Sequence, residues 1–156
     1  MSLDIARATA ATPEVIELIT ELEAEMSPNY PPEQNHGLSL DSLFEPHIHF
    51  LIARADGRGV GCGGIALYPG FAELKRFYVK PDQRGRGVAD TILRQLGNVA
   101  AAKGVTLLRL ETGMQQQAAL RFYKRCGFER CTAFEPYASM PPEAIASSVF
   151  MEKTLG

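Results

Sequence analysis

The sequence predicts an α/β (α+β) domain with a central, mixed, mostly antiparallel β-sheet of six to seven strands, flanked by about four helices. Apolar residues repeat with the periods of strands and helices in the order β-α-α-β-β-β-α-β-α-β-β. In the second half a long helix connects two strands, which implies at least one parallel strand pair. The length suits a single domain over residues 1–156.

The first half of the chain begins with a strand and a helix. Leu3 to Thr9 is a short apolar run, and Thr12-Pro13 then opens a helix with proline at its first position. This helix is expected to end at Ser27-Pro28, because the stretch from Pro28 to Leu38 is rich in helix breakers and predicts an irregular loop. A short helix is expected around Leu40 to Phe44.

Two turn signals divide the next segment into three strands. Asp56-Gly57 and Pro69-Gly70 are typical of tight turns, and the runs between them are rich in strand-forming residues. We expect an antiparallel meander of strands at 49–53, 60–68 and 71–79.

The remaining elements alternate between helix and strand. Helical spacing of apolar residues runs from Val88 to Lys103-Gly104, where a basic last turn and a glycine predict the end of the helix. After it we expect a strand, a helix and two further strands, at 107–111, 115–125, 128–133 and 149–153.

The composition is that of an ordinary soluble globular protein, with 46% apolar and 22% charged residues. The apolar runs are too short to cross a membrane and the amino end lacks the layout of a secretion signal, so we expect a cytoplasmic protein without membrane contact. A net charge of -2 gives no general attraction to nucleic acid. The three cysteines lack Cys-x-x-Cys spacing, which argues against a disulfide framework or a metal site.

The most informative segment is the glycine-rich turn Lys80-Pro-Asp-Gln-Arg-Gly-Arg-Gly-Val-Ala89, between a predicted strand and a predicted helix. Such a turn directs backbone N–H groups and the positive end of the helix dipole at one point, which favours a phosphate. Gly85 and Gly87 lack a Cβ, so the chain can adopt unusual dihedrals and a ligand can approach the main chain, while Arg84 and Arg86 add positive charge. The sequence therefore predicts a pyrophosphate site, with a plain solvated turn as the alternative.

This turn matches neither of two common nucleotide motifs. The nucleotide P-loop requires Gly-x4-Gly-Lys-Ser/Thr, and the dinucleotide fingerprint requires glycine or alanine where this chain has Asp90. Arg84, Gly87 and Ala89 fit the pattern Arg/Gln-x-x-Gly-x-Gly/Ala. The chain resembles, over essentially its whole length, the GCN5-related N-acetyltransferases (GNAT superfamily), which hold the pyrophosphate of acetyl-CoA with this pattern. The resemblance implies the GNAT fold, acetyl-CoA as co-substrate and no metal.

The resemblance also covers the strand from Ala72 to Val79, which is similar to the superfamily strand whose main chain pairs with the pantetheine arm. It implies contacts from Phe77 and Val79. Strand alternation predicts Glu73 on the same face as these two residues, at the position where several GNAT enzymes have a general base. A base is needed because an amine must be uncharged to attack. The alternative is that Glu73 is a solvated residue or an ion-pair partner of a neighbouring basic residue, Lys75 or Arg76.

A second segment, Ala118 to Phe128, resembles the superfamily helix that ends in Tyr-x-x-x-Gly-Phe. It implies that Tyr123 protonates the leaving thiolate of coenzyme A. The alternative is a core tyrosine whose hydroxyl is capped by a carbonyl. Gln116 replaces the asparagine that contacts the pantetheine arm in many members, so this contact stays open. The implied cofactor-binding residues are Phe77, Val79, Arg84, Gly85, Arg86, Gly87, Val88, Ala89 and Gln116.

The resemblance implies transfer of an acetyl group to a primary amine. We expect this transfer to be direct, because Cys62 and Cys126 are typical of packing residues rather than nucleophiles. We expect a small-molecule acceptor and no nucleic-acid partner. A non-catalytic acyl-CoA sensor, a protein N-terminal or lysine acetyltransferase and a homodimer stay open. Glu111 and His36 are alternative bases. The candidates for lining the acceptor pocket are Tyr30, His36, Tyr68, Glu111 and Tyr137.

Overall fold

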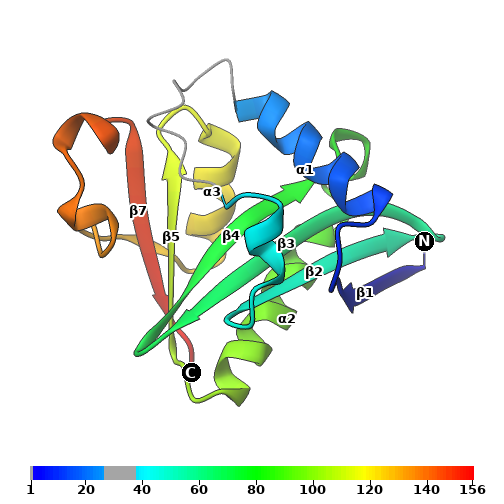
Figure 1. Ribbon diagram of the computed structural model, residues 1–156, viewed down its shortest axis with the longest axis horizontal. Coiled ribbons are helices and arrows are strands. Elements are labelled where there is room, and N and C mark those ends of the chain that lie inside the picture. Colours follow the sequence, from blue (N-terminus) through cyan, green and yellow to red (C-terminus); the bar gives the residue numbers. More distant parts are fainter. Residues whose placement is uncertain (1, 27–37) are drawn as a thin grey trace.

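The computed structural model describes residues 2–26 and 38–156, which form one seven-stranded sheet in the order β1-β2-β3-β4-β5-β7-β6 (Figure 1). The strands are β1 (Leu3–Arg7), β2 (Ile48–Ala55), β3 (Arg58–Tyr68), β4 (Phe71–Val79), β5 (Leu107–Gly113), β6 (Glu129–Arg130) and β7 (Ser148–Thr154). The α-helices are α1 (Pro13–Met26), α2 (Val88–Ala102) and α3 (Gln117–Arg125). Four short 3-10 helices complete the described elements: η2 (Asp41–Phe44), η3 (Pro81–Gln83), η4 (Tyr137–Ser139) and η5 (Pro142–Ala144).

The predicted fold class is confirmed. The sheet is mixed, since β4 and β5 are parallel and the other neighbours are antiparallel. The helix number was slightly too high, because the fourth predicted helix is the single 3-10 turn η2 in the part of the chain that the structure describes. The predicted loop from Pro28 to Leu38 lies almost wholly outside the described residues.

The strand predicted at 128–133 is reduced to β6. Only Glu129 and Arg130 pair with β7, after which the chain leaves the sheet and buries Phe134 and Tyr137 in an aromatic cluster with Phe150. Burial of these rings stabilises the departure from the sheet. Helix α3 begins two residues later than predicted, because Gln116 lies in the turn before it.

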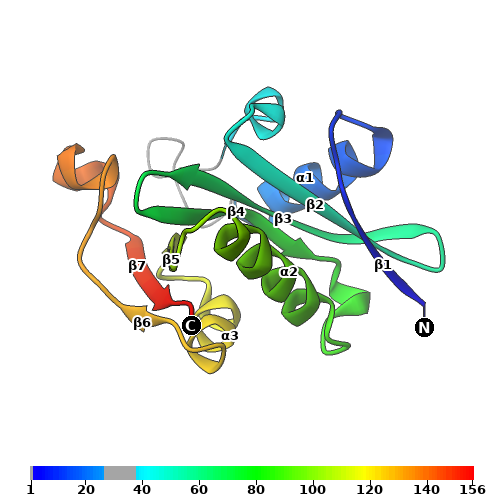
Figure 2. The same ribbon diagram turned by 90° about the horizontal axis from the view of Figure 1, so that it is seen from below.

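The helices cover both faces of the sheet (Figure 2). Helix α1 packs on one face through its apolar stripe of Val15, Leu18, Ile19 and Leu22. Helices α2 and α3 pack on the other face, over a second core. None of the described helices is long and apolar enough to span a bilayer.

Strands β4 and β5 separate along their length. They pair only at Ala72 with Leu108 and at Glu73 with Arg109, whereas β5 pairs with β7 from Leu107 to Gly113. The ribbons of β4 and β5 diverge beyond this point (Figure 1). The backbone of β4 after Glu73 therefore has a free edge toward β5.

Strand β4 also carries a β-bulge opposite β3. Cys62 pairs with Tyr78 and Gly64 pairs with Lys75, so β4 has one residue more than β3 between these pairs. Arg76, inside the bulge, has a positive φ of 52°.

The bulge overturns one prediction. It reverses the alternation of side chains, so that Phe77 and Val79 share the α2 face with Leu74, while Tyr78 packs on the α1 face. Glu73 precedes the bulge and lies on the α1 face, opposite Phe77 and Val79. The predicted common face was wrong because a strict two-residue period does not survive an extra residue.

Candidate active site

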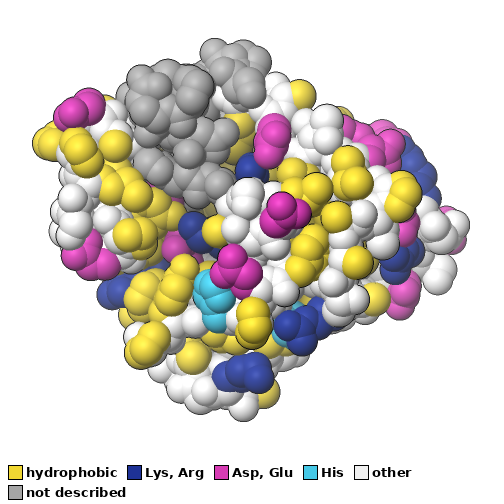
Figure 3. Space-filling view, viewed as in Figure 1, with side chains coloured by type: hydrophobic (Ala, Val, Ile, Leu, Met, Phe, Trp, Pro, Cys, Tyr) yellow, Lys and Arg dark blue, Asp and Glu magenta, His cyan; other side chains and the backbone are white. Residues whose placement is uncertain are grey.

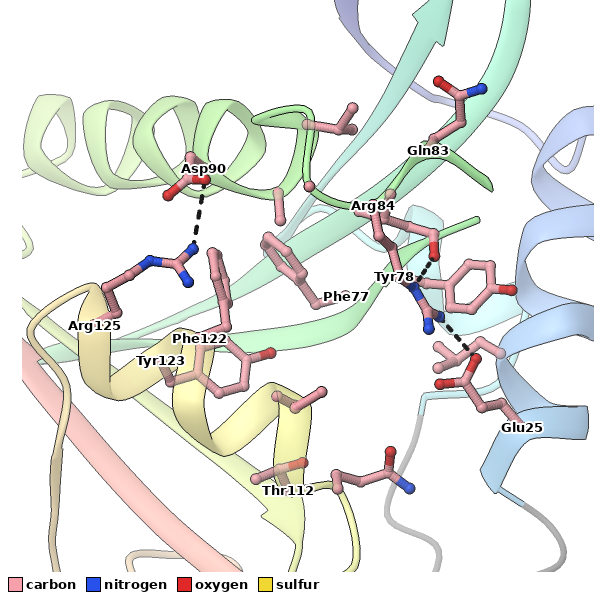
Figure 4. A pocket seen from close by; sticks show the side chains of 18 of the residues that line it. Glu25, Phe77, Tyr78, Gln83, Arg84, Asp90, Thr112, Phe122, Tyr123 and Arg125 are labelled. Carbon is pink, nitrogen blue, oxygen red and sulfur yellow. Dashed lines mark hydrogen bonds and ion pairs between the residues drawn. The ribbon is translucent and has the colours of Figure 1, made fainter. Parts of the chain in front are cut away.

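A cavity of about 560 Å³ lies where β4 and β5 separate (Figure 4). It is enclosed by the end of α1, β4, the turn before α2, the end of β5 and α3. Eight of the nine residues predicted to bind the cofactor line it: Phe77, Val79, Arg84, Gly85, Gly87, Val88, Ala89 and Gln116. Arg86 is exposed and is not among the lining residues.

The glycine-rich turn forms one wall of this cavity. Gly85 and Gly87 have positive φ angles of 78° and 80°, which confirms the predicted unusual dihedrals. A Cβ placed on either residue meets no atom within 4 Å, so the backbone faces open space. Gly87 is the N-cap of α2, and no hydrogen bond within the described chain is donated by the N–H groups of 85–87. This geometry suits an anion at the amino end of α2.

Arg84 is held beside the turn by two contacts. Its Nε donates to the carbonyl of Val79 at 2.9 Å, and its Nη2 donates to Oε2 of Glu25 at 2.9 Å (Figure 4). The guanidinium also lies 5.6 Å from the ring centre of Tyr78. Glu25, on α1, lines the cavity and was not predicted, because 59 residues separate it from Arg84 in the sequence.

Tyr123 lies on the cavity side of α3 and is 8% exposed. Its ring packs against Phe77, Phe122 and Phe128 at centroid distances of 6.3, 5.4 and 5.7 Å. Figure 4 shows the hydroxyl directed into the cavity, and no hydrogen bond from it is found within residues 2–26 and 38–156. Burial raises the pKa of Tyr123 well above its ordinary value, so the phenol is held protonated.

Glu73 lies on the opposite face of the sheet, at the last pair that joins β4 to β5. It is 1% exposed, so the prediction of a solvated residue is wrong, whereas the ion pair with Lys75 is present. Its Oε2 accepts a hydrogen bond from Tyr137 Oη at 2.5 Å and lies 2.9 Å from Lys75 Nζ. Its Oε1 is buried and has no hydrogen-bond partner among the described residues. Arg76 pairs instead with Glu23.

Several acceptor-pocket candidates gather near Glu73. Tyr137 contacts it directly, and burial together with the Glu73 carboxylate raises the pKa of Tyr137 far above its ordinary value. Burial and the charge of Glu73 also raise the pKa of Tyr68. Glu111 accepts a hydrogen bond from Ser148 Oγ at 2.6 Å. Tyr30 and His36 lie outside the described residues.

Two features of this site were not predicted. Lys75 donates to Tyr137 Oη at 2.8 Å, so that Lys75, Tyr137 and Glu73 form one hydrogen-bonded group. The bulge that separates Glu73 from Phe77 had a sequence signal in the Gly63-Gly64 pair, because glycines inside a strand mark bulges and close approaches. A Cβ on Gly63 would lie 2.7 Å from the ring of Phe77.

Comparison with known proteins gives consistent matches over the whole chain. Residues 15–128 match the model of the acetyltransferase (GNAT) family. The chain is 38% identical over 156 residues to the IAA acetyltransferase of Azospirillum brasilense, with 99% of both chains covered. A structure from Klebsiella pneumoniae, described as an acyl-CoA N-acyltransferase, superposes with a TM-score of 0.78 at 34% identity, covering 99% of this chain and 98% of the other.

A more distant structure shows that the fold is shared. The PaiA N-acetyltransferase of Thermoplasma acidophilum, solved in complex with coenzyme A, has a TM-score of 0.70 at 21% identity and covers 99% of both chains. The family match extends over most of the chain and includes the glycine-rich turn, β4 and α3. The protein thus belongs to the GNAT acetyltransferase family and is an N-acetyltransferase.

Proposed function

We propose that the protein is a single-domain enzyme that transfers the acetyl group of acetyl-CoA directly to the primary amine of a small-molecule acceptor. Glu73 acts as the general base and Tyr123 as the general acid. The observation that carries this proposal is the position of these two groups on opposite faces of the sheet, at the opening between β4 and β5. Tyr123 lines the cavity and Glu73 does not, so the proposal requires a thioester at this opening to be reached by Tyr123 from one face and by Glu73 from the other.

The donor site is supported by the cavity and its turn. The turn from Gly85 to Gly87 offers a helix amino end and N–H groups that donate no hydrogen bond to any described residue, with Arg84 beside it, which suits the pyrophosphate. The free edge of β4 accepts the pantetheine arm as an additional strand, next to Phe77 and Val79. Gln116 lines the same cavity, and we propose that it contacts this arm.

The chemical step needs one proton acceptor and one proton donor. The acceptor nitrogen loses its proton to Oε1 of Glu73 and attacks the thioester carbonyl, so that a C–N bond forms. The C–S bond then breaks, the thiolate takes a proton from the hydroxyl of Tyr123, and the remaining excess proton on the amide nitrogen restores that hydroxyl. The hydroxyl of Tyr123 carries its proton at neutral pH, as a phenol does even without the burial that raises its pKa.

Direct transfer, without an acyl-cysteine intermediate, is supported by the low reactivity of Cys62, which lies opposite Tyr78 of β4. Cys62 is buried on β3, burial raises the pKa of its thiol to about 12, and its Sγ donates to the carbonyl of Arg76 at 3.4 Å. Such a thiol is a poor nucleophile, because the thiolate is the reactive form.

The function is tested by screening pools of small primary amines and of peptides for release of free coenzyme A from acetyl-CoA. Release that depends on a small amine supports the proposal. Release with peptides alone points to a protein acetyltransferase. Binding of acetyl-CoA without any acceptor-dependent release identifies a non-catalytic sensor. Size-exclusion chromatography of the same sample tests the homodimer.

Tyr123→Phe is expected to keep ground-state binding and to slow acetyl transfer by roughly 10- to 10³-fold. The ring contacts with Phe77, Phe122 and Phe128 persist and only the hydroxyl is lost. Single-turnover rate and melting temperature are measured on the same variant. A variant destabilised by about 1 kcal/mol with normal turnover would instead indicate a structural hydroxyl, and the acid assignment would fail.

A further inference from the structure

The side of the sheet that carries Glu73 contains a buried polar group within an aromatic environment. Tyr137 packs against Phe134 and Phe150 at centroid distances of 5.4 Å each. On this face, acidic and basic side chains lie together beside the apolar side chains of the 131–147 segment (Figure 3). Burying a polar group in such surroundings costs free energy unless the group is hydrogen-bonded. An oxygen that is buried without a partner therefore marks a place where a ligand can bind.

The two carboxylate oxygens of Glu73 are not equivalent. Oε2 has two donors, the hydroxyl of Tyr137 at 2.5 Å and the ammonium of Lys75 at 2.9 Å. Oε1 has no hydrogen-bond partner in the described parts of the chain, although its residue is 1% exposed. A buried unpaired carboxylate oxygen costs free energy that a bound donor regains.

We propose that Lys75 and Tyr137 are positioning residues that fix the Glu73 carboxylate through Oε2 and thereby reserve Oε1 for the N–H of the acceptor. This deepens the proposed function and rests on it. Lys75 supplies a positive charge, and it also donates to Tyr137 Oη at 2.8 Å, which directs the tyrosine proton toward Glu73. A hydrogen-bonded, charge-assisted group of this kind fixes the orientation of the carboxylate plane.

Other charged and titratable groups surround Glu73 without bonding to it. Tyr68 on β3 is an electrostatic neighbour, and Glu111 on β5 lies near Tyr137. Arg109 is the strand partner of Glu73, but its guanidinium pairs with Glu152 and lies over the rings of Phe71 and Phe134. Among the described residues, Lys75 is therefore the cationic side chain that pairs with the Glu73 carboxylate.

The inference is tested by titrating the carboxyl carbon of Glu73 by NMR, in protein labelled with carbon-13 at the glutamate Cδ. The resonance is assigned by its loss in Glu73→Gln. Removing the charge or the donor makes the carboxylate easier to protonate, so Lys75→Met and Tyr137→Phe should each raise the titration midpoint of this resonance, by about one pH unit or more for Lys75→Met. Lys75→Arg keeps the charge and should restore the wild-type midpoint. Lys103→Met, an exposed charge removal at the end of α2, should leave it unchanged.

A midpoint that stays at the wild-type value in Lys75→Met and Tyr137→Phe overturns the inference, even where these variants melt at a lower temperature. Tyr137→Phe keeps the ring contacts with Phe134 and Phe150, so a folded variant is available for the measurement. The outcome is separable from that of the proposed function. Glu73→Gln with normal acceptor-dependent release of coenzyme A refutes Glu73 as the base, whereas shifted midpoints alone concern only the positioning residues.

Discussion

Gly87→Asp is expected to abolish binding of acetyl-CoA while the fold persists. Gly87 has a φ of 80° and an open space where a Cβ would lie, so the new carboxylate projects into the region expected for the pyrophosphate. A like charge about 4 Å from a phosphate costs about 1 kcal/mol in water and about 4 kcal/mol near a protein surface. The new side chain also excludes the ligand sterically. The left-handed conformation costs the folded protein about 1 to 2 kcal/mol.

Calorimetric titration with acetyl-CoA and a melting curve check this result. Gly57→Asp is a matched control, because Gly57 has a φ of 83° and equally open space but lies in the turn between β2 and β3. It carries the same backbone strain and should bind acetyl-CoA normally. Gly87→Ala carries the backbone strain without the negative charge, so the difference in acetyl-CoA affinity between it and Gly87→Asp measures the effect of the carboxylate. Undiminished affinity in Gly87→Asp would remove the basis of the donor site.

Glu73→Gln is expected to lower the acceptor-dependent rate by on the order of 10²-fold or more, with little change in the affinity for acetyl-CoA. The affinity is preserved because Glu73 lies on the face of the sheet opposite the cavity-lining Phe77 and Val79. The acidic limb of the pH–rate profile should flatten, since the group that must be ionised for catalysis is gone.

The measurement is the pH dependence of the rate with the amine identified by screening, together with acetyl-CoA affinity and melting temperature. The melting temperature is needed because Glu73 is buried and paired with Lys75. Glu111→Gln is the comparison variant, since Glu111 is the described alternative base and accepts its hydrogen bond from Ser148. An unchanged profile in Glu73→Gln would transfer the role to Glu111, His36 or solvent.

The glycine-rich turn illustrates what sequence patterns predict well. Its parts lie within ten residues, and the positive φ angles of Gly85 and Gly87 and the start of α2 at Val88 were all expected. The Nε of Arg84 donates to the carbonyl of Val79, five residues away, which fixes the arginine side chain beside the turn. Local contacts of this kind depend on backbone preferences that a short sequence already contains.

The surroundings of Glu73 illustrate what such patterns miss. The residue was a candidate base and its pairing with Lys75 was an expected alternative, but its face was predicted wrongly, and its burial and its contact with Tyr137 were not predicted. Tyr137 is 64 residues away in the sequence and reaches Glu73 because the chain leaves the sheet after β6 and returns over it. No local preference encodes a contact of this separation.

By itself the sequence determined the order of the elements, the mixed sheet and the anion-binding turn, because hydrophobic periods and glycine conformations act over a few residues. Only the tertiary structure decided that Glu73 and Phe77 lie on opposite faces, because the extra residue at Arg76 becomes visible only when β3 and β4 are paired. It also decided that Lys75 and Tyr137 hold one oxygen of Glu73 while the other stays unpaired among the described residues. Burial and long-range pairing set these features, and both are properties of the assembled chain.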